Sequence, residues 1–140
     1  PRAMRRVETT TSWTYTTATV RQANGAAANQ VEVLVGWAEV PVSVRLHGSC
    51  SNTGAGVNVW MGIGEDSTGA PHASSVSSTV TTPVAAYRVP LAAGFDTYPA
   101  GGRHYYTWLE WSAAAGTTTW AGDDTASTPM RTGITGSIMG

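Results

Sequence analysis

The feature that most constrains this chain is the alternation of side-chain types with a period of two. In Ser12–Arg21, for example, Trp13 and Tyr15 alternate with Ser12 and Thr14. Successive side chains of a β-strand point to opposite faces, so this period is typical of a strand with one buried face. Gly, Asn, Asp and Pro residues separate the alternating stretches, and helical periodicity is hard to find. The sequence therefore predicts an all-β chain.

The alternating stretches predict a compact antiparallel β-sandwich, of the jelly-roll type. Short strands separated by turn residues at regular intervals are typical of such folds. The expected strands are Ser12–Arg21, Val31–Val40, Pro41–Ser51, Val57–Gly64, Thr79–Leu91 (split or placed at an edge by Pro83 and Pro90), Arg103–Ser112, Thr117–Trp120 and Gly133–Met139. Residues 12–140 would form the sandwich. Residues 1–11 would be an N-terminal connector from a preceding stalk or domain.

Length and charge fit one domain whose surface is partly covered. The chain has 140 residues, no lysine, a charged fraction of 12% and a formal net charge of -1. Charge this sparse predicts that a partner or another copy of the chain covers part of the surface. A nucleic-acid partner is not expected, because the chain lacks a basic face. No apolar run approaches the roughly 20 residues of a membrane-spanning helix, so membrane insertion is not expected either.

The residues that could perform catalysis are few and scattered. No serine lies in a G-x-S-x-G motif, and the single cysteine, Cys50, shares an apolar strand face with Val44 and Leu46, which predicts a buried thiol. Three isolated histidines lack metal-ligand spacing. The sequence therefore predicts a protein that is not an enzyme and that uses no cofactor or metal. Calcium near Asp123 and Asp124 stays open, since clustered oxygens suit that ion but the EF-hand pattern is absent.

The aromatic residues suggest two kinds of contact. Arg103–Ser112 carries aromatic side chains on both faces, as expected of a strand whose outer face meets a neighbouring subunit. The predicted interface residues are His104, Tyr106, Trp108 and Trp60. Tryptophan can also stack on a sugar ring while nearby polar groups bind its hydroxyls. The loop with Trp120, Asp123 and Asp124 is the predicted sugar site, joined by Glu65 and Asp66, for which turn formation is the alternative role.

Several strings together resemble the C-terminal domains of bacteriophage fibre and receptor-binding proteins. They are Ser12–Gly36, Val57–Ser67, Gly102–Trp111, Gly116–Asp124 and the ending Gly133–Gly140 (GITGSIMG). The resemblance implies a homotrimeric component of the virion surface, a fibre or spike tip that caps a stalk and contacts a host glycan or envelope component. It also implies other virion proteins as partners, in the stalk, tail or capsid.

Two alternatives remain open at this stage. One is a capsid decoration or head-fibre domain with a purely structural role. The other is a glycan depolymerase, which would need carboxylates from different segments to converge in one pocket.

Overall fold

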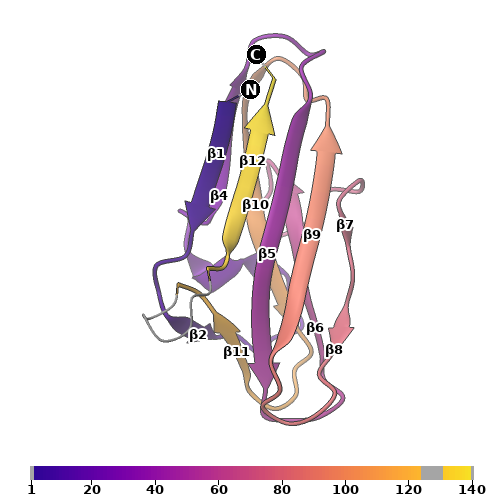
Figure 1. Ribbon diagram of the computed structural model, residues 1–140. Helices are drawn as coiled ribbons and strands as arrows, with labels where there is room; N and C mark the ends of the chain where they lie inside the picture. The colour runs from indigo at the N-terminus through magenta and orange to yellow at the C-terminus, as the bar shows by residue number, and fades with distance from the viewer. Residues whose placement is uncertain (1, 124–130, 140) are drawn as a thin grey trace.

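The computed structural model describes residues 2–123 and 131–139, and it confirms the all-β sandwich. Two antiparallel sheets pack face to face, and the two ends of the chain lie at the same end of the molecule (Figure 1). The described residues include one short 3-10 turn, Ala23–Gly25, and no helix long and apolar enough to cross a membrane.

The first sheet, sheet A, is built around the long strand β5. Its strands are β1 (Arg2–Val7), β2 (Ser12–Thr14), β5 (Val42–Asn52), β7 (Val76–Ser77), β9 (Val89–Thr97), β11 (Thr118–Ala121) and β12 (Gly133–Ile138). Strands β12 and β11 pair with successive halves of one edge of β5, and β9 pairs with the other edge.

The second sheet, sheet B, is built around β10 in the same way. Its strands are β3 (Arg21–Gln22), β4 (Gln30–Val35), β6 (Asn58–Glu65), β8 (Val80–Thr81) and β10 (Gly102–Ser112). Strands β4 and β3 share one edge of β10, and β6 pairs with the other edge.

The pairing of the main strands is that of a jelly roll. Strand β1 pairs with β12, β4 with β10, β5 with β9 and β6 with β8. In chain order these pairs are nested inside one another. This nesting places β1, β12, β5 and β9 in one sheet and β4, β10, β6 and β8 in the other. The predicted topology is therefore confirmed.

Several expected boundaries differ from the structure. The strand expected at Val31–Val40 ends at Val35, after which the chain bends and turns. Residues 2–7 lie within the segment expected to be a connector, but they form β1 and pair with β12 along its whole length. The arginines of this run favoured a connector over a strand. An edge strand, however, tolerates charged side chains. The stretch Ser12–Arg21 is only partly a strand, because the chain turns after Thr14 and the Tyr15 hydroxyl donates to the carbonyl of Thr19 at 2.8 Å.

The core lies between the sheets. Leu46 and Cys50 from β5, Phe95 from β9 and Trp108 from β10 are buried there. Burial raises the pKa of the Cys50 thiol to about 12, so this cysteine stays protonated. The prediction of a buried, inert Cys50 is confirmed.

Candidate functional site: a tryptophan-lined hollow on sheet B

Two tryptophans lie opposite each other on the outer face of sheet B. Strand β6 turns Val59 and Met61 toward the core, so Trp60 points outward, and Trp111 of β10 is its partner in the register. Both side chains are half-buried and line a hollow with a cavity volume of about 500 Å³. That volume lies within the range of small-ligand sites, roughly 300–1,000 Å³.

The orientation of Trp60 is fixed from two sides. Its indole N–H donates to the hydroxyl oxygen of Ser77 at 2.8 Å. Its six-membered ring lies over Gly62, where the Cβ of any other residue would overlap ring carbons. The glycine therefore lets the indole lie along its own strand, and contacts within the protein set the position of the ring.

The loop after β6 forms one wall of the hollow, to which Pro71, His72 and Ser75 contribute. Its backbone is tied to sheet B, since the His72 N–H donates to the carbonyl of Ile63 at 3.0 Å. Gly64 lets the loop approach closely, because a Cβ there would meet the carbonyl oxygens of Ser67 and Ala70. Gly62 and Gly64 of β6 thus make room for the Trp60 ring and for this loop.

His72 connects the hollow to the core. Its ring packs on Phe95 with centroids 4.7 Å apart. Nδ1 accepts the backbone N–H of Ser74 at 3.1 Å, and Nε2 lies 3.5 Å from Oε2 of Glu65. Both ring nitrogens therefore have neighbours within the protein, and this part of the loop is held in one position.

Glu65 and Asp66, two of the predicted sugar ligands, hold the loop instead. Asp66 accepts the backbone N–H of Tyr105 at 3.0 Å with one oxygen, and its other oxygen lies 2.7 Å from Nδ1 of His104. Glu65 accepts the Tyr106 hydroxyl at 3.2 Å. The two carboxylates lie outside the hollow lining, in a network of internal bonds.

His104, predicted at a subunit interface, bridges that network to the turn between β9 and β10. Nε2 lies 2.9 Å from the carbonyl oxygen of Ala100, and Nδ1 faces Asp66. Both neighbours only accept, so the doubly protonated imidazolium fits this position. Burial lowers the pKa of His104, but the bonds to Asp66 and Ala100 outweigh it, and the pKa lies above its ordinary value.

The predicted sugar site around Trp120 is wrong in its central residue. Trp120 is fully buried, and its indole N–H donates to the carbonyl of Tyr15 at 3.0 Å. Neither ring face can meet a sugar, because strand β11 turns this side chain into the core. Asp123 forms an isolated bridge with Arg131, and Asp124 lies outside the described residues. Within residues 2–123 and 131–139, no group of three or more His, Cys, Asp or Glu could hold a metal ion.

Two predicted interface residues are also misplaced. Tyr106 and Trp108 are fully buried between the sheets, where another chain cannot reach them. Alternation gives β10 aromatic side chains on both faces. In the structure, the face that carries Tyr106 and Trp108 is the inner one. Trp60 does lie at the surface, so its contact with another chain stays a prediction.

Sequence reasoning missed Trp111, His72, Ser75 and Ser77 as members of one site. The polar composition of residues 65–78, with Gly69 and Pro71, predicts only an exposed loop. The pairing of β6 with β10 was needed to bring Trp60 beside Trp111, and no local pattern carries that pairing.

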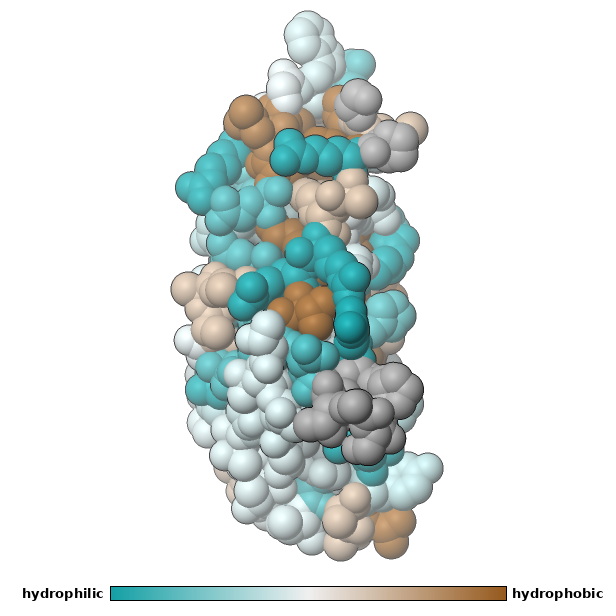
Figure 2. Space-filling model, turned by 60° about the vertical axis from the view of Figure 1, so that its left-hand side comes forward, coloured by the Kyte–Doolittle hydropathy of each residue, from teal (hydrophilic) through white to brown (hydrophobic). Residues whose placement is uncertain are grey.

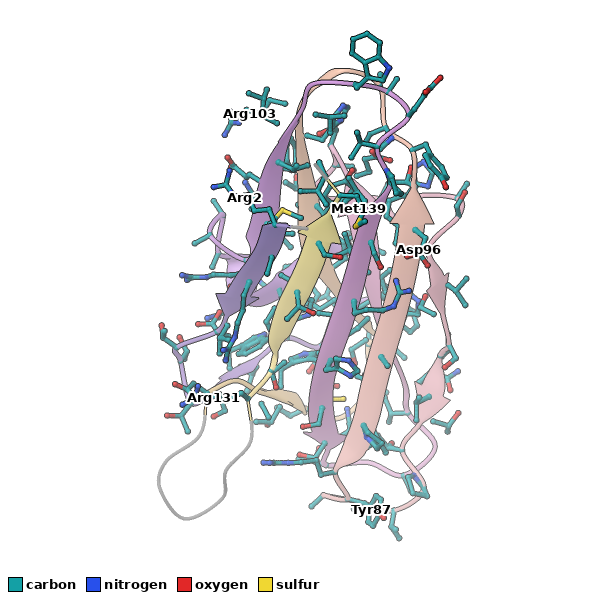
Figure 3. The ribbon with its side chains drawn as sticks, turned by 45° about the horizontal axis from the view of Figure 1, so that its top comes forward. Arg2, Tyr87, Asp96, Arg103, Arg131 and Met139 are labelled. Atoms are coloured by element: carbon teal, nitrogen blue, oxygen red, sulfur yellow. The ribbon has the colours of Figure 1, made fainter. Side chains whose placement is uncertain are left out.

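A second surface lies at the end of the molecule that carries both chain ends. Its large apolar side chains are exposed, with Leu34 77%, Trp37 70% and Met139 56% accessible. Figure 2 shows brown, apolar side chains gathered at this end and crossed by hydrophilic ones. Arg2, Arg103 and Met139 lie here, and Tyr87 lies at the opposite end (Figure 3). A second hollow of about 330 Å³ lies at this end, and Arg2, Arg103 and Leu34 are among the residues that line it.

The chain is similar to known proteins in structure and not in sequence. No protein-family model and no curated protein sequence matches the chain. One solved structure to which it is similar is described as "EclA C-terminal domain; sugar-binding protein". The likeness has a TM-score of 0.37 and 12% identity, and it covers 86% of this chain and 74% of the other.

Proposed function

We propose that this domain binds carbohydrate at the hollow on sheet B. The observation that carries the proposal is the pair of half-buried tryptophans, Trp60 and Trp111, opposite each other on adjacent strands. An indole offers a flat apolar surface to the apolar face of a sugar ring. Ser75, Ser77 and Thr79 at the wall supply hydroxyls of the kind that bond sugar hydroxyls.

The proposed activity is binding without hydrolysis. Two-carboxylate hydrolysis needs a pair of acids on either side of the scissile bond. Among the described residues that line the hollow there is no carboxylic acid. Glu65 and Asp66 are neighbours in sequence and accept bonds from Tyr106 and from the Tyr105 backbone.

The experiment compares Trp60→Ala and Trp111→Ala with Trp37→Ala on a glycan array and by calorimetry. Loss of a stacking tryptophan is expected to weaken binding at least tenfold, since central aromatic contacts cost about 2 kcal/mol or more. Trp37 is exposed and lies away from the hollow, so its variant should bind as the parent does. Equal binding by all four proteins would contradict the proposal.

We further propose that this binding serves attachment of a phage fibre or spike tip, a homotrimer on the virion surface, to its host. The support is the resemblance of the strings Val57–Ser67 and Gly102–Trp111 to such domains, and both strings contribute to the hollow. A labelled domain should stain host cells, and Trp60→Ala should not. Light scattering that gives the mass of one chain at every concentration would contradict the trimer.

The second candidate is a structural role, as a capsid decoration or head-fibre domain. The exposed side chains of Leu34, Trp37 and Met139 favour it, because contiguous apolar surface marks contact with other proteins. Under this candidate the variant Trp37→Ala, and not Trp60→Ala, would lose function.

A further inference from the structure

The hollow around Trp60 and Trp111 is lined without fixed charge. Among the described residues at its wall there is no Asp, Glu or Arg, and the chain contains no lysine. The nearest arginine in sequence to the lining residue Val20 is Arg21. Its guanidinium is bound to Glu110 at 2.8 Å and lies over the Tyr15 ring, so it is already occupied.

His72, the ionisable residue of the wall, has both ring nitrogens directed at groups of the protein. Its Nδ1 accepts the N–H of Ser74, which leaves the ring proton on Nε2, and Nε2 faces Glu65 at 3.5 Å. The Glu65 carboxylate behind the ring would repel an anion in the hollow. A carboxylate held there would lose water and gain no partner of opposite charge, which is costly.

Two hydroxyls of the wall have unused hydrogen-bonding capacity. Ser77 accepts the Trp60 N–H with its oxygen, so its own proton remains to be donated. The Ser75 oxygen is buried and has no hydrogen-bond partner among the described residues. Since Ser75 lines the hollow, rotation about its Cα–Cβ bond would break no hydrogen bond of this oxygen within the described residues. A buried hydroxyl without a partner is uncommon and points to a missing one.

We propose that the hollow selects an uncharged pyranose over its acidic counterpart, and that Ser75 is a specificity-determining hydrogen-bond partner of the sugar. This inference rests on the proposed carbohydrate binding. It adds the preference for an uncharged sugar and the role of Ser75. Either claim can be disproved while carbohydrate binding itself stands.

The first test uses matched sugars and the parent protein. Calorimetry compares glucose, galactose and mannose oligosaccharides with the same oligosaccharides oxidised to uronic acids. The neutral member of the preferred pair should bind about tenfold more tightly or better. Equal binding, or tighter binding of the acid, would overturn the selectivity and leave the proposed function intact. No binding of either member of any pair would overturn both.

The second test compares Ser75→Ala with Ser78→Ala. Ser75→Ala removes no hydrogen bond within the described protein, so its melting temperature should stay unchanged. Its affinity for the preferred neutral sugar should fall about 3- to 10-fold, the effect of one hydrogen bond. Ser78 is exposed and outside the hollow, so its variant should bind like the parent. Parental affinity in Ser75→Ala would overturn the assignment of Ser75.

Discussion

The inner and outer faces of sheet B both carry aromatic side chains, but these differ in how deeply they are buried. On the inner face of β10, Tyr106 and Trp108 are fully buried. On its outer face, Trp111 remains half-buried beside Trp60. The difference arises because sheet A covers the inner face, whereas on the outer one only the segment after β6 and Val20, among the described residues, border the hollow beside the strands. Aromatic side chains thus stabilise the fold on the inner side, and on the outer side they line the hollow of the proposed sugar site.

The inner face also buries a charge. Glu110 is fully buried, and its carboxylate accepts the Trp13 indole N–H at 2.7 Å and binds Arg21. Burial raises the pKa of Glu110, although these bonds oppose the shift. Trp13 in turn packs edge-to-face on Trp108 at 5.6 Å, so the charge, both indoles and strand β3 form one connected unit. Within the part of the chain that the structure describes, no such hydrogen bond or ion pair anchors the Trp111 ring on the outer face.

The largest expected effect comes from Trp108→Ala on the inner face. The lost burial, the cavity and the lost contact with Trp13 should lower the free energy of unfolding by about 3–5 kcal/mol. The same truncation at Trp111 should cost much less, because that ring is half-exposed. Chemical denaturation of both variants tests the comparison. Similar losses of stability would mean that the two faces do not differ as described.

An intermediate effect is expected from Gly62→Ala on the outer face. The added methyl would overlap the Trp60 ring, which should swing away from the sheet. Sugar binding should fall about tenfold, while stability changes by less than about 1 kcal/mol, since a surface ring can move where a core ring cannot. The matched control is Gly69→Ala, where a Cβ would meet open space. Parental affinity in Gly62→Ala would argue against a fixed Trp60 platform.

The smallest effect is expected from pH, through His104 at the end of the inner face. The folded state raises the pKa of His104, so its stabilising contribution is complete below the unfolded pKa, near 6.5, and is lost as pH rises through the folded pKa. Unfolding measured from pH 5 to 9 should show this loss in the parent and not in His104→Asn. His47→Asn, at an exposed position of β5, should keep the parental profile. A parental profile in His104→Asn would contradict the bridge to Asp66 and Ala100.

Strand content and the buried thiol followed from sequence alone. A period of two identifies strands and divides their residues between two faces. In β5 one face carries the apolar residues Val42, Val44 and Leu46, so that face had to be the buried one. Pro83 splits the stretch Thr79–Leu91 as expected, since β8 ends at Thr81, but Pro90 does not, because it lies inside β9 and pairs with Ser49.

The tertiary structure alone decided which aromatic residues are core and which are surface. In β10 both faces are aromatic, so alternation could not say which one sheet A covers, and Tyr106 and Trp108 were misplaced for that reason. The pairing of Trp60 with Trp111, and the position of Ser75 beside them, depend on contacts between segments far apart in the chain. Local periodicity reports on neighbours along a strand, whereas a site is made by the strands and loops that the fold brings together.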